Sequence, residues 1–570
     1  MNRVSAFPPA STRPRAAGAR VLKFAALAAL VPWIWACTLS QNGVVPPSDT
    51  FFYPTSALMA PLTAGKTNPT DDPASHWLYV ANSNADLRFN DGTLVMANVG
   101  AEITDDAGNV LRPGAETDRA TSGLWGACPQ ADYVNPLSRS LPQTCCWDLL
   151  DSNILNCDER RYIQSDTTVL IGSFAALMVW QSLCDDPCLA YHGTASAPLA
   201  CLADPNGGRI LIGVRGDTSL TYVDVVPTDP NAAPHPAFHC TGDAATTSLA
   251  ECNQKVVDTS SSLAIESGDP QAPATALPDE PYALTLDPAR GYLYVGHLVG
   301  STSVQDTGGV SLFDVSGTGF IAAGEFPPAP RFIAPFGSPF PPSSSGLFGV
   351  TALTLHEPLG VPPDPNMDPN SKQLYVSSRY VPLVTAMAPI GPSICAGDMN
   401  DDVLVPSGNT LNSNLVGSEM RGVQFIEPLP GSQPNYAQRA YALQRVPPDL
   451  VGFDIATDVA GSANATPTDV LETCSSPTFL YQHDAGDGPR LFVNCFDTGE
   501  VYVFDPSGPT LLTTFAVGRG PAGMVFDTAR PLAYVIDFTQ SDVSVVDLTP
   551  GSPTQYHLIQ RLGFPTVTPR

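Results

Sequence analysis

A short apolar strand pattern recurs seven times along this chain of 570 residues. Each copy holds mostly β-branched, aromatic and aliphatic residues between turn-forming segments, which is typical of a packed β-strand. The copies lie at residues 77–82, 209–214, 292–297, 373–378, 439–444, 490–495 and 532–537. Another apolar segment precedes each copy, and these candidate first strands start near residues 53, 173, 281, 349, 421, 476 and 520. Seven β-hairpins of one kind are therefore predicted.

A third strand that ends in an acidic residue follows most of the hairpins. The acids are Asp224, Asp314, Asp454, Asp505 and Asp547, and the first unit has Asn98 in this place. The fourth unit shows no clear third strand between Tyr380 and Met420. The last two central strands are 42 residues apart, from Phe492 to Tyr534. That spacing matches a four-stranded propeller blade of about 40–45 residues.

The segment from Gly520 to Leu548 reads GPAGMVFDTARPLAYVIDFTQSDVSVVDL and resembles the YVTN repeat of β-propellers. The resemblance implies an all-β fold, a seven-bladed β-propeller over residues 51–570. A linear array of β-sandwiches is the alternative fold, and six or eight blades are the alternative counts. The chain ends in a strand-like segment at 557–566, and the first unit begins at Tyr53. We expect these two ends to complete one blade together, which would leave no exposed sheet edge.

Long insertions interrupt the units at about residues 100–166, 182–205, 227–275 and 391–420. Loops of such length are uncommon unless they are functional or covalently held. Twelve cysteines follow position 37, and they are Cys128, Cys145, Cys146, Cys157, Cys184, Cys188, Cys201, Cys240, Cys252, Cys395, Cys474 and Cys495. We predict disulfide-rich loop insertions, with the pairing left open. Metal binding is the alternative, but it favours C-x2-C pairs, and Cys184 and Cys188 have three residues between them.

The N-terminus has the pattern of an export signal. Four basic residues between positions 13 and 23 precede thirteen mostly apolar residues, a run shorter than a membrane span of about 20 residues. The run ends in Ala36-Cys37, which resembles the lipobox of bacterial lipoproteins. The resemblance implies a signal peptide over 1–36 and a tether over 37–50 that is lipidated at Cys37. An ordinary secretory signal cleaved near Ala36 is the alternative.

Charge and composition exclude several classes of protein. Hydrophobic residues make up 43% of the chain and charged residues 14%, which excludes a disordered chain. With 27 basic and 55 acidic residues, the formal net charge is -28, so the surface repels phosphate backbones and no nucleic-acid partner is expected. The sequence has no P-loop, G-x-S-x-G, H-E-x-x-H or C-x-x-C-H motif, and no cofactor is predicted.

Six polar residues lie at or just past the ends of the central strands, and they are Asn82, Arg215, His297, Arg379, Arg445 and Asp537. In a propeller these positions would point toward one mouth of the ring and suit a polar or anionic partner. Ordinary hairpin-end residues are the alternative. Asp398, Asn400 and Asp402 alternate like the first half of a calcium loop but lack the glycine at the sixth position, so a solvated loop is favoured and no metal is predicted.

Together these features predict an exported protein, lipid-anchored to the cell envelope at the outer membrane, on its periplasmic or surface face. We expect a non-catalytic binding or scaffold module for an envelope protein or a surface polymer, which touches the membrane through its lipid anchor only. The alternative is a propeller enzyme, a lactonase-like hydrolase or an oxidoreductase, with its site at the ring mouth.

Overall fold

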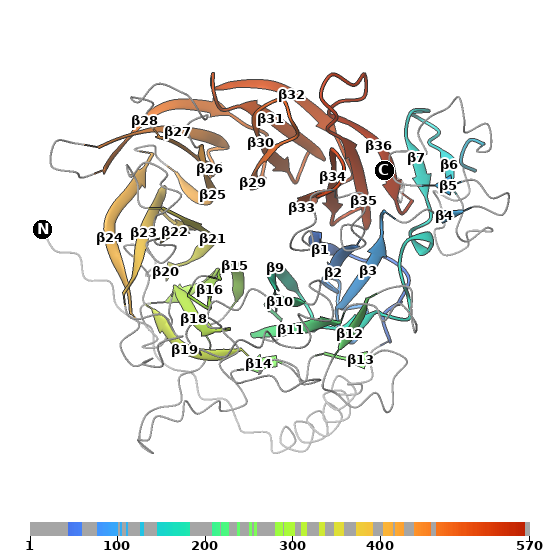
Figure 1. Ribbon diagram of the computed structural model, residues 1–570, viewed down its shortest axis with the longest axis horizontal. Coiled ribbons are helices and arrows are strands. Elements are labelled where there is room, and N and C mark those ends of the chain that lie inside the picture. The colour runs from blue at the N-terminus through green and yellow to red at the C-terminus, as the bar shows by residue number, and fades with distance from the viewer. Residues whose placement is uncertain are drawn as a thin grey trace, which may run out of the picture.

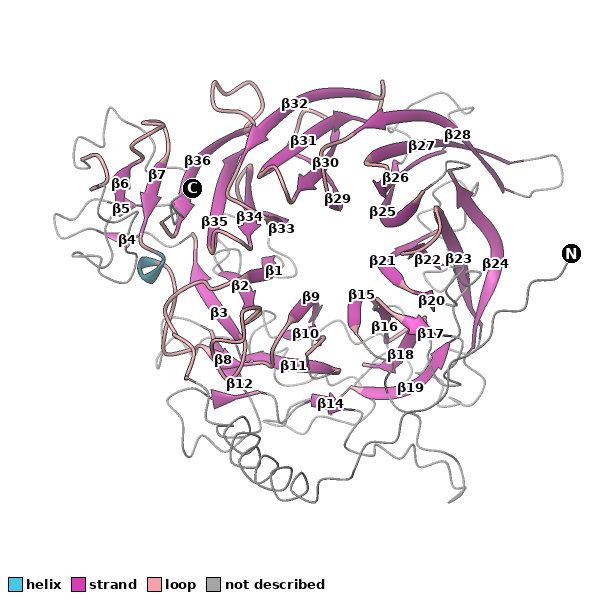
Figure 2. Cartoon of the chain, turned by 180° about the vertical axis from the view of Figure 1, so that it is seen from behind, coloured by secondary structure: helices cyan, strands magenta, loops and turns pink. Residues whose placement is uncertain are grey.

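The computed structural model describes most of the chain between residues 44 and 564. The described residues are 44–59, 77–100, 126–129, 145–182, 208–216, 218–226, 236–239, 250–252, 277, 280–288, 290–301, 309–315, 330–336, 347–357, 372–390, 403–413, 417–426, 438–457 and 463–564, with short strands also at 103–104, 110–111 and 256–258. Over these residues no helix has the length and hydropathy needed to cross a membrane. One 3-10 turn, Glu159–Arg161, stands among the strands (Figure 2).

Seven antiparallel sheets surround a central axis as the blades of a propeller (Figure 1), which confirms the all-β, seven-bladed prediction. The innermost strands are β1 (Pro54–Met59), β9 (Ala175–Ser182), β15 (Pro281–Asp287), β21 (Val350–His356), β25 (Ser418–Ile426), β29 (Pro477–Asp484) and β33 (Pro521–Phe526). The second strands are β2 (Trp77–Asn82), β10 (Gly208–Val214), β16 (Tyr292–His297), β22 (Gln373–Ser378), β26 (Gln438–Val446), β30 (Pro489–Cys495) and β34 (Leu532–Asp537). All seven predicted central strands are therefore present.

The outer half of each blade holds a third and a fourth strand. The third strands are β3 (Thr93–Asn98), β11 (Ser219–Val226), β18 (Val310–Asp314), β23 (Leu383–Ile390), β27 (Asp449–Thr457), β31 (Glu500–Asp505) and β35 (Asp542–Asp547). The fourth strands are β8 (Val169–Leu170), β12 (Ala237–His239), β19 (Arg331–Phe336), β24 (Val403–Asn412), β28 (Ala463–Glu472), β32 (Thr510–Ala516) and β36 (His557–Leu562). Two short strands, β13 (Ala250–Glu251) and β14 (Val256–Asp258), extend the first two blades.

The middle of each second strand forms the core between blades. An aromatic residue occupies the same buried position in six of the seven units, and these residues are Tyr79, Tyr294, Tyr375, Tyr441, Phe492 and Tyr534. Because alternate residues of a strand point to opposite faces of its sheet, the side chains on either side of this position fill the gap to the other neighbouring blade. Each blade is thus apolar on both faces, as the continuous apolar runs in the sequence require.

The fourth blade corrects one prediction. The third strand that the sequence did not reveal is β23, and β24 lies within the insertion predicted at 391–420. The segment of β23 reads LVTAMAPI, in which alanines and Pro389 weaken the strand pattern. The strand forms because Leu374, Tyr375 and Val376 of β22 supply pairing partners for it.

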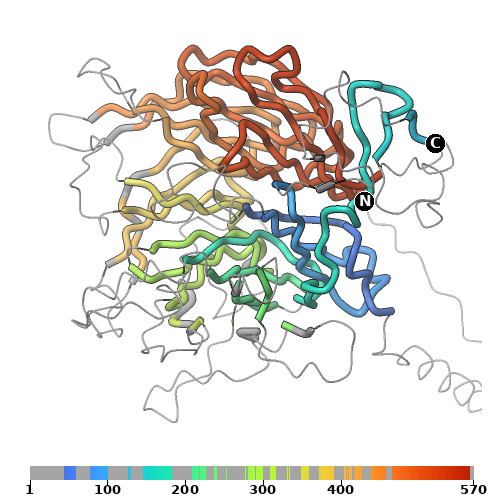
Figure 3. The backbone as a smooth tube through the Cα atoms, turned by 45° about the vertical axis from the view of Figure 1, so that its right-hand side comes forward, coloured from blue at the N-terminus to red at the C-terminus, as the bar shows by residue number. Residues whose placement is uncertain are grey.

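Ring closure corrects another prediction. The chain ends do not share a blade, because the last blade takes β33 to β36 from the C-terminal segment and the first blade is built from β1, β2, β3 and β8 of the N-terminal one. A hairpin from the first insertion, β6 (Cys145–Trp147) and β7 (Leu155–Cys157), instead pairs with the outer edge of the last blade. Figure 3 shows the first blade in blue beside the last blade in red.

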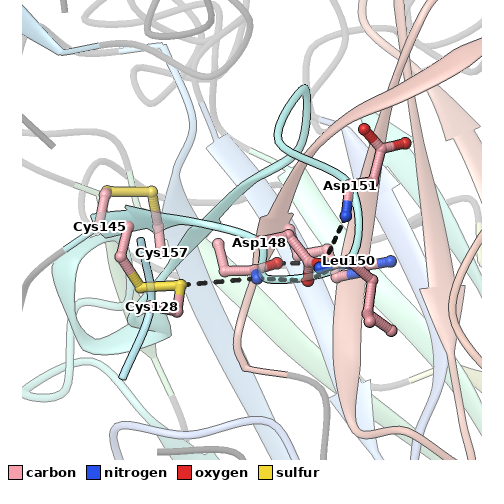
Figure 4. Close-up of a disulfide and its surroundings, with 9 residues drawn as sticks. Cys128, Cys145, Asp148, Leu150, Asp151 and Cys157 are labelled. Atoms are coloured by element: carbon pink, nitrogen blue, oxygen red, sulfur yellow. Dashed lines mark hydrogen bonds and ion pairs between the residues drawn. A yellow bond between two sulfur atoms is a disulfide. The ribbon is translucent and has the colours of Figure 1, made fainter. Parts of the chain in front are cut away.

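Two disulfides and a polar cluster fix this closing hairpin (Figure 4). Cys145–Cys157 joins its two strands, and Cys128–Cys146 ties it to the preceding segment. Adjacent cysteines can serve different partners here because neighbouring residues of a strand face opposite ways. Asp148 accepts hydrogen bonds from the backbone of its own turn, and Arg561 of β36 pairs with Asp148 at 3.1 Å. The ring is therefore closed by an inserted hairpin.

The remaining cysteines divide into two groups. Cys474–Cys495 links the start of the sixth blade to the end of β30, and Cys252 is also disulfide-bonded. Disulfide formation is confirmed for these seven cysteines. The others, namely Cys184, Cys188, Cys201, Cys240 and Cys395, lie outside the described residues.

Candidate functional site

One face of the ring is built from repeated positions at the junction of the first and second strands. Every first strand has a bulge near its start, so one residue there is left out of the pairing with the second strand. Bulges of this kind redirect side chains. In six blades, the residue just past the second strand donates a backbone hydrogen bond of 2.9–3.1 Å to the residue that precedes the first strand. We call the face defined by these junctions the upper mouth.

In each second strand, the residue three positions past the central core position is buried. Asn82, His297 and Asp537 hold this position, and all three are fully buried. Asn82 donates to Thr93 at 2.9 Å, and the His297 Nε2 lies 2.8 Å from the Ser311 hydroxyl. The structure therefore places half of the predicted mouth residues inside the blades, because the side-chain direction alternates along a strand.

Asp537 is buried against a second acid. Its Oδ2 accepts a hydrogen bond of 2.6 Å from Ser544, and Asp542 accepts one of 2.7 Å from Gln540. Burial, and then the negative charge of Asp542, raise the pKa of Asp537 well above its usual range, although the hydrogen bond from Ser544 acts in the opposite direction. Gly518 packs so closely that a Cβ there would lie 2.4 Å from the Asp537 carboxyl carbon.

The residue one position further points out of the blade, and here the other three predicted residues lie. Arg379 and Arg445 both reach Glu419, which precedes the bulge of β25: the Arg379 Nε is 3.8 Å and the Arg445 Nη1 is 3.5 Å from its carboxylate oxygens. Arg215 pairs instead with Glu280 at 3.1 Å, and both side chains are about one-third exposed. The structure thus brings Arg379 and Arg445 together and places Arg215 two blades away.

A third arginine completes the cluster around Glu419. Arg421, at the bulge of β25, places its Nη2 3.2 Å from the Glu419 carboxylate, and its side chain is only 9% exposed. Its Nη1 lies 3.5 Å from the hydroxyl of Tyr282, which belongs to the blade two places away. A contact between such blades is made across the central axis. We call Arg379, Glu419, Arg421 and Arg445 the arginine cluster.

Two side chains from bulge positions also meet across the centre of the ring. Tyr282 of the third blade stacks on Phe479 of the sixth at a centroid separation of 6.4 Å. Arg215 lies 5.9 Å from the Tyr282 ring centroid. The blades that this pair joins, those of β15 and β29, lie on opposite sides of the ring in Figure 1. We call Tyr282 and Phe479 the floor of the upper mouth.

Aromatic residues hold the equivalent positions on the other side of the ring. They are Tyr53 and Phe174, which precede first strands, and Phe496 and Phe538, which follow second strands. The Phe538 ring centroid is 5.4 Å from that of Tyr53 and 6.0 Å from that of Phe496. All four residues are half-buried. The upper mouth is therefore charged over the second to fifth blades and aromatic over the sixth, seventh, first and second.

Sequence reasoning missed Glu280, Glu419, Arg421 and the floor residues. Glu280 and Glu419 share one backbone feature with their counterparts in other blades, a positive φ next to the bulge of the first strand, which Tyr53, Phe174, Ser476 and Gly520 also have. Non-glycine residues adopt this backbone infrequently, and such positions concentrate at functional sites. The calcium candidates Asp398, Asn400 and Asp402 lie outside the described residues. Among the described residues no three His, Cys, Asp or Glu side chains are grouped to hold a metal ion.

The comparisons with known proteins do not assign this chain to a family. No family model matches the chain, and no curated protein matches it. Among solved structures, the periplasmic gluconolactonase PpgL of Pseudomonas aeruginosa is 15% identical over 63% of this chain and 83% of its own, with a TM-score of 0.37.

Two further structures are similar at the same level. A putative 6-phosphogluconolactonase of Bacteroides fragilis is 10% identical over 83% of this chain and 97% of its own, with a TM-score of 0.35. The dihydro-heme d1 dehydrogenase NirN is 11% identical over 62% of this chain and 54% of its own, with a TM-score of 0.32. Likeness at this level says nothing about function, and membership of the YVTN family stays a prediction.

Proposed function

We propose that this protein is an exported, envelope-anchored β-propeller that binds a small oxyanion, a carboxylate or a phosphate group, at the upper mouth. The observation that carries the proposal is the arginine cluster, in which three guanidinium groups surround one carboxylate. Guanidinium groups bind carboxylates and phosphates through charge-assisted, often bidentate hydrogen bonds. Glu419 neutralises only one of the three positive charges.

The local charge opposes that of the whole protein. The charged side of the upper mouth holds Arg215, Arg379, Arg421 and Arg445 against Glu280 and Glu419, an excess of two positive charges. The whole chain has a formal net charge of -28. Salt screens the electrostatic potential of charged groups beyond about 8 Å at physiological concentration. A positive site on so acidic a protein therefore attracts an anion only at short range. We therefore expect a ligand small enough to enter the mouth, or the acidic end group of a surface polymer.

The envelope location rests on the N-terminal pattern and the oxidised cysteines. The bonded cysteines Cys128, Cys145, Cys146 and Cys157 fit a protein that folds in an oxidising compartment. Cys37 lies outside the described residues. We propose that it is lipidated and anchors the protein to the outer membrane, and that the partner is an envelope protein or a surface polymer that carries the bound acidic group.

Calorimetric titration with inorganic phosphate at 0.15 M salt tests the site. Arg445→Gln should weaken binding about tenfold or more, since a hydrogen bond to a charged group is worth about 1.5–3 kcal/mol. Glu419→Gln should strengthen binding, because it removes the competing carboxylate. Arg439→Gln is the matched control. Arg439 starts the strand that Arg445 nearly ends, and it pairs with Asp454 at 2.8 Å, about 20 Å from the mouth.

The outcomes separate the proposal from its rivals. Phosphate binding that the three variants change alike, or no binding at all, would refute the oxyanion site. The enzyme alternative is tested on the same samples by following proton release from a lactone. Turnover that Arg421→Gln abolishes and Arg439→Gln preserves would favour a hydrolase over a binding module.

A further inference from the structure

The arginine cluster and the aromatic side of the upper mouth meet at neighbouring blades. Arg445 is the last residue but one of β26 in the fifth blade, and Phe496, just past β30, holds the equivalent position of the repeat in the sixth. Phe538 in the seventh and Tyr53 in the first continue the row, with ring centroids 5.4–6.0 Å apart. A ligand whose acid is bound by the arginines would therefore extend directly over aromatic rings.

The floor of the upper mouth also places a positive charge beside aromatic rings. Arg421 is a cation buried to nine-tenths, and its Nε has no hydrogen-bond partner among the described residues. A buried donor without a partner is costly, which marks this arginine as one that packing alone does not explain. The Tyr282 hydroxyl lies 3.5 Å from the Nη1 of the same arginine, and the Tyr282 ring stacks on Phe479. A position that can bind an anion thus lies next to an apolar surface at the centre of the ring as well as on its rim.

We propose that the ligand of the upper mouth is an oxyanion carried on an aromatic ring. Its acid lies among Arg379, Arg421 and Arg445, and its ring packs against Phe496 and Phe538. This inference rests on the proposed function and narrows it to a class of molecule. Aromatic rings pack against one another in stacked or edge-to-face pairs that add to the burial of apolar area. Phe496 and Phe538 are both half-buried, so part of each side chain stays accessible to a ligand.

Phenyl phosphate and inorganic phosphate form the matched pair of probes, because they share the acid and differ by the ring. We expect phenyl phosphate to bind about tenfold more tightly to the intact protein, since burial of a ring and one or two aromatic contacts supply a gain of that order. Acetate and benzoate repeat the comparison for a carboxylate. Phe538→Ala and Phe496→Ala should each reduce the preference for the ring by about threefold and leave the affinity for inorganic phosphate unchanged.

Phe526→Ala is the matched control, because Phe526 ends the first strand of the seventh blade and stacks on His483 at 4.1 Å, away from the upper mouth. It should leave the preference for the ring intact. Equal affinities for the two phosphates, with binding that still depends on Arg445, would overturn this inference and leave the oxyanion site standing. A preference for the ring that survives in both rim variants would overturn the placement of the ring. Failure of both phosphates to bind would overturn the inference and the proposed function together.

Discussion

Replacement of Asp537 by Asn should stabilise the protein relative to the native chain, and this difference in stability should increase as the pH rises. Asp537 lies wholly inside the seventh blade, with Ser544 as a donor to its Oδ2 and a second acid, Asp542, beside it. Burial, followed by the charge of Asp542, raises the pKa of Asp537 well above its usual range. An Asn side chain has nearly the same shape, cannot ionise, and offers an N–H to the remaining carboxylate.

Proton linkage determines whether Asp537 stabilises or destabilises the folded protein as the pH rises. A buried acid with a raised pKa binds its proton more tightly in the folded chain than in the unfolded one, where an aspartate titrates near pH 3.9. The native protein therefore loses stability as the pH rises from about 4 to the folded pKa of Asp537. The loss amounts to about 1.4 kcal/mol per pH unit for one proton. Asp537→Asn lacks this loss, so its advantage over the native protein should grow by about that amount between pH 4.5 and pH 5.5.

Urea denaturation at several pH values between 4 and 8 measures the difference. Asp547→Asn provides a control of opposite sign, from the end of the next strand. Burial raises the pKa of Asp547, but hydrogen bonds from Thr549 and Thr554 outweigh burial and hold it below its usual range. Its contribution to stability is present above about pH 4 and is lost as the pH falls. Asp547→Asn should therefore be less stable than the native protein at pH 7, and the difference should vanish at low pH.

The reasoning would be refuted by parallel curves. If Asp537→Asn and the native protein lose stability equally with rising pH, then Asp537 does not titrate in the buried environment described above. A variant that is less stable at every pH would mean that the carboxyl group stabilises the blade by its hydrogen bonds more than its burial costs.

Three further predictions follow from packing, covalent bonds and the N-terminal pattern. Gly518→Ala should lower the melting temperature, because its new Cβ would lie 2.4 Å from the Asp537 carboxyl carbon and force the blade apart. The double variant Cys145→Ser, Cys157→Ser opens a loop with a sequence separation of 12 and should cost about 3 kcal/mol of stability, seen as a lower urea midpoint; an unchanged midpoint would contradict it. Cys37→Ser should move the protein from the membrane fraction to the soluble fraction, and continued membrane attachment would exclude the lipid anchor.

The sequence was sufficient for the blade count because one position recurs with little variation. Buried aromatics such as Tyr294 and Tyr534 mark the second strand in unit after unit, and strand pairing is local within each blade. The third strand of the fourth blade, β23, was not predicted, because it carries Pro389 and ends without an acid. Ring closure could not be predicted, since the parallel pairing of β7 with β36 joins segments about 400 residues apart. Neither segment has a sequence pattern that indicates its pairing partner.

Six polar residues were predicted near one end of the second strands, and a shift of one residue along the strand decides which of them reach the upper mouth. His297 and Asp537 end their strands and are buried, whereas Arg379 and Arg445, one position further along the repeat, both reach Glu419. Alternation is a period of two, so the exact end of a strand must be known before a side chain can be assigned to a face. Arg421 was missed because its direction depends on a bulge, and a bulge is a property of the pairing between two strands.

The closing hairpin also sets an order of events as the chain folds. Its two disulfides span 12 and 18 residues, so it can form from its own segment alone once the chain is in an oxidising compartment. Its partner in β36, Gln560, lies 403 residues after Cys157 in the chain. Until β36 is in place, the edges of β7 and β35 that it joins stay unpaired. A chain that stops before β36 would keep both edges exposed, and unpaired sheet edges are templates for aggregation. The six residues of β36 therefore protect two sheet edges, one from each end of the chain, from self-association.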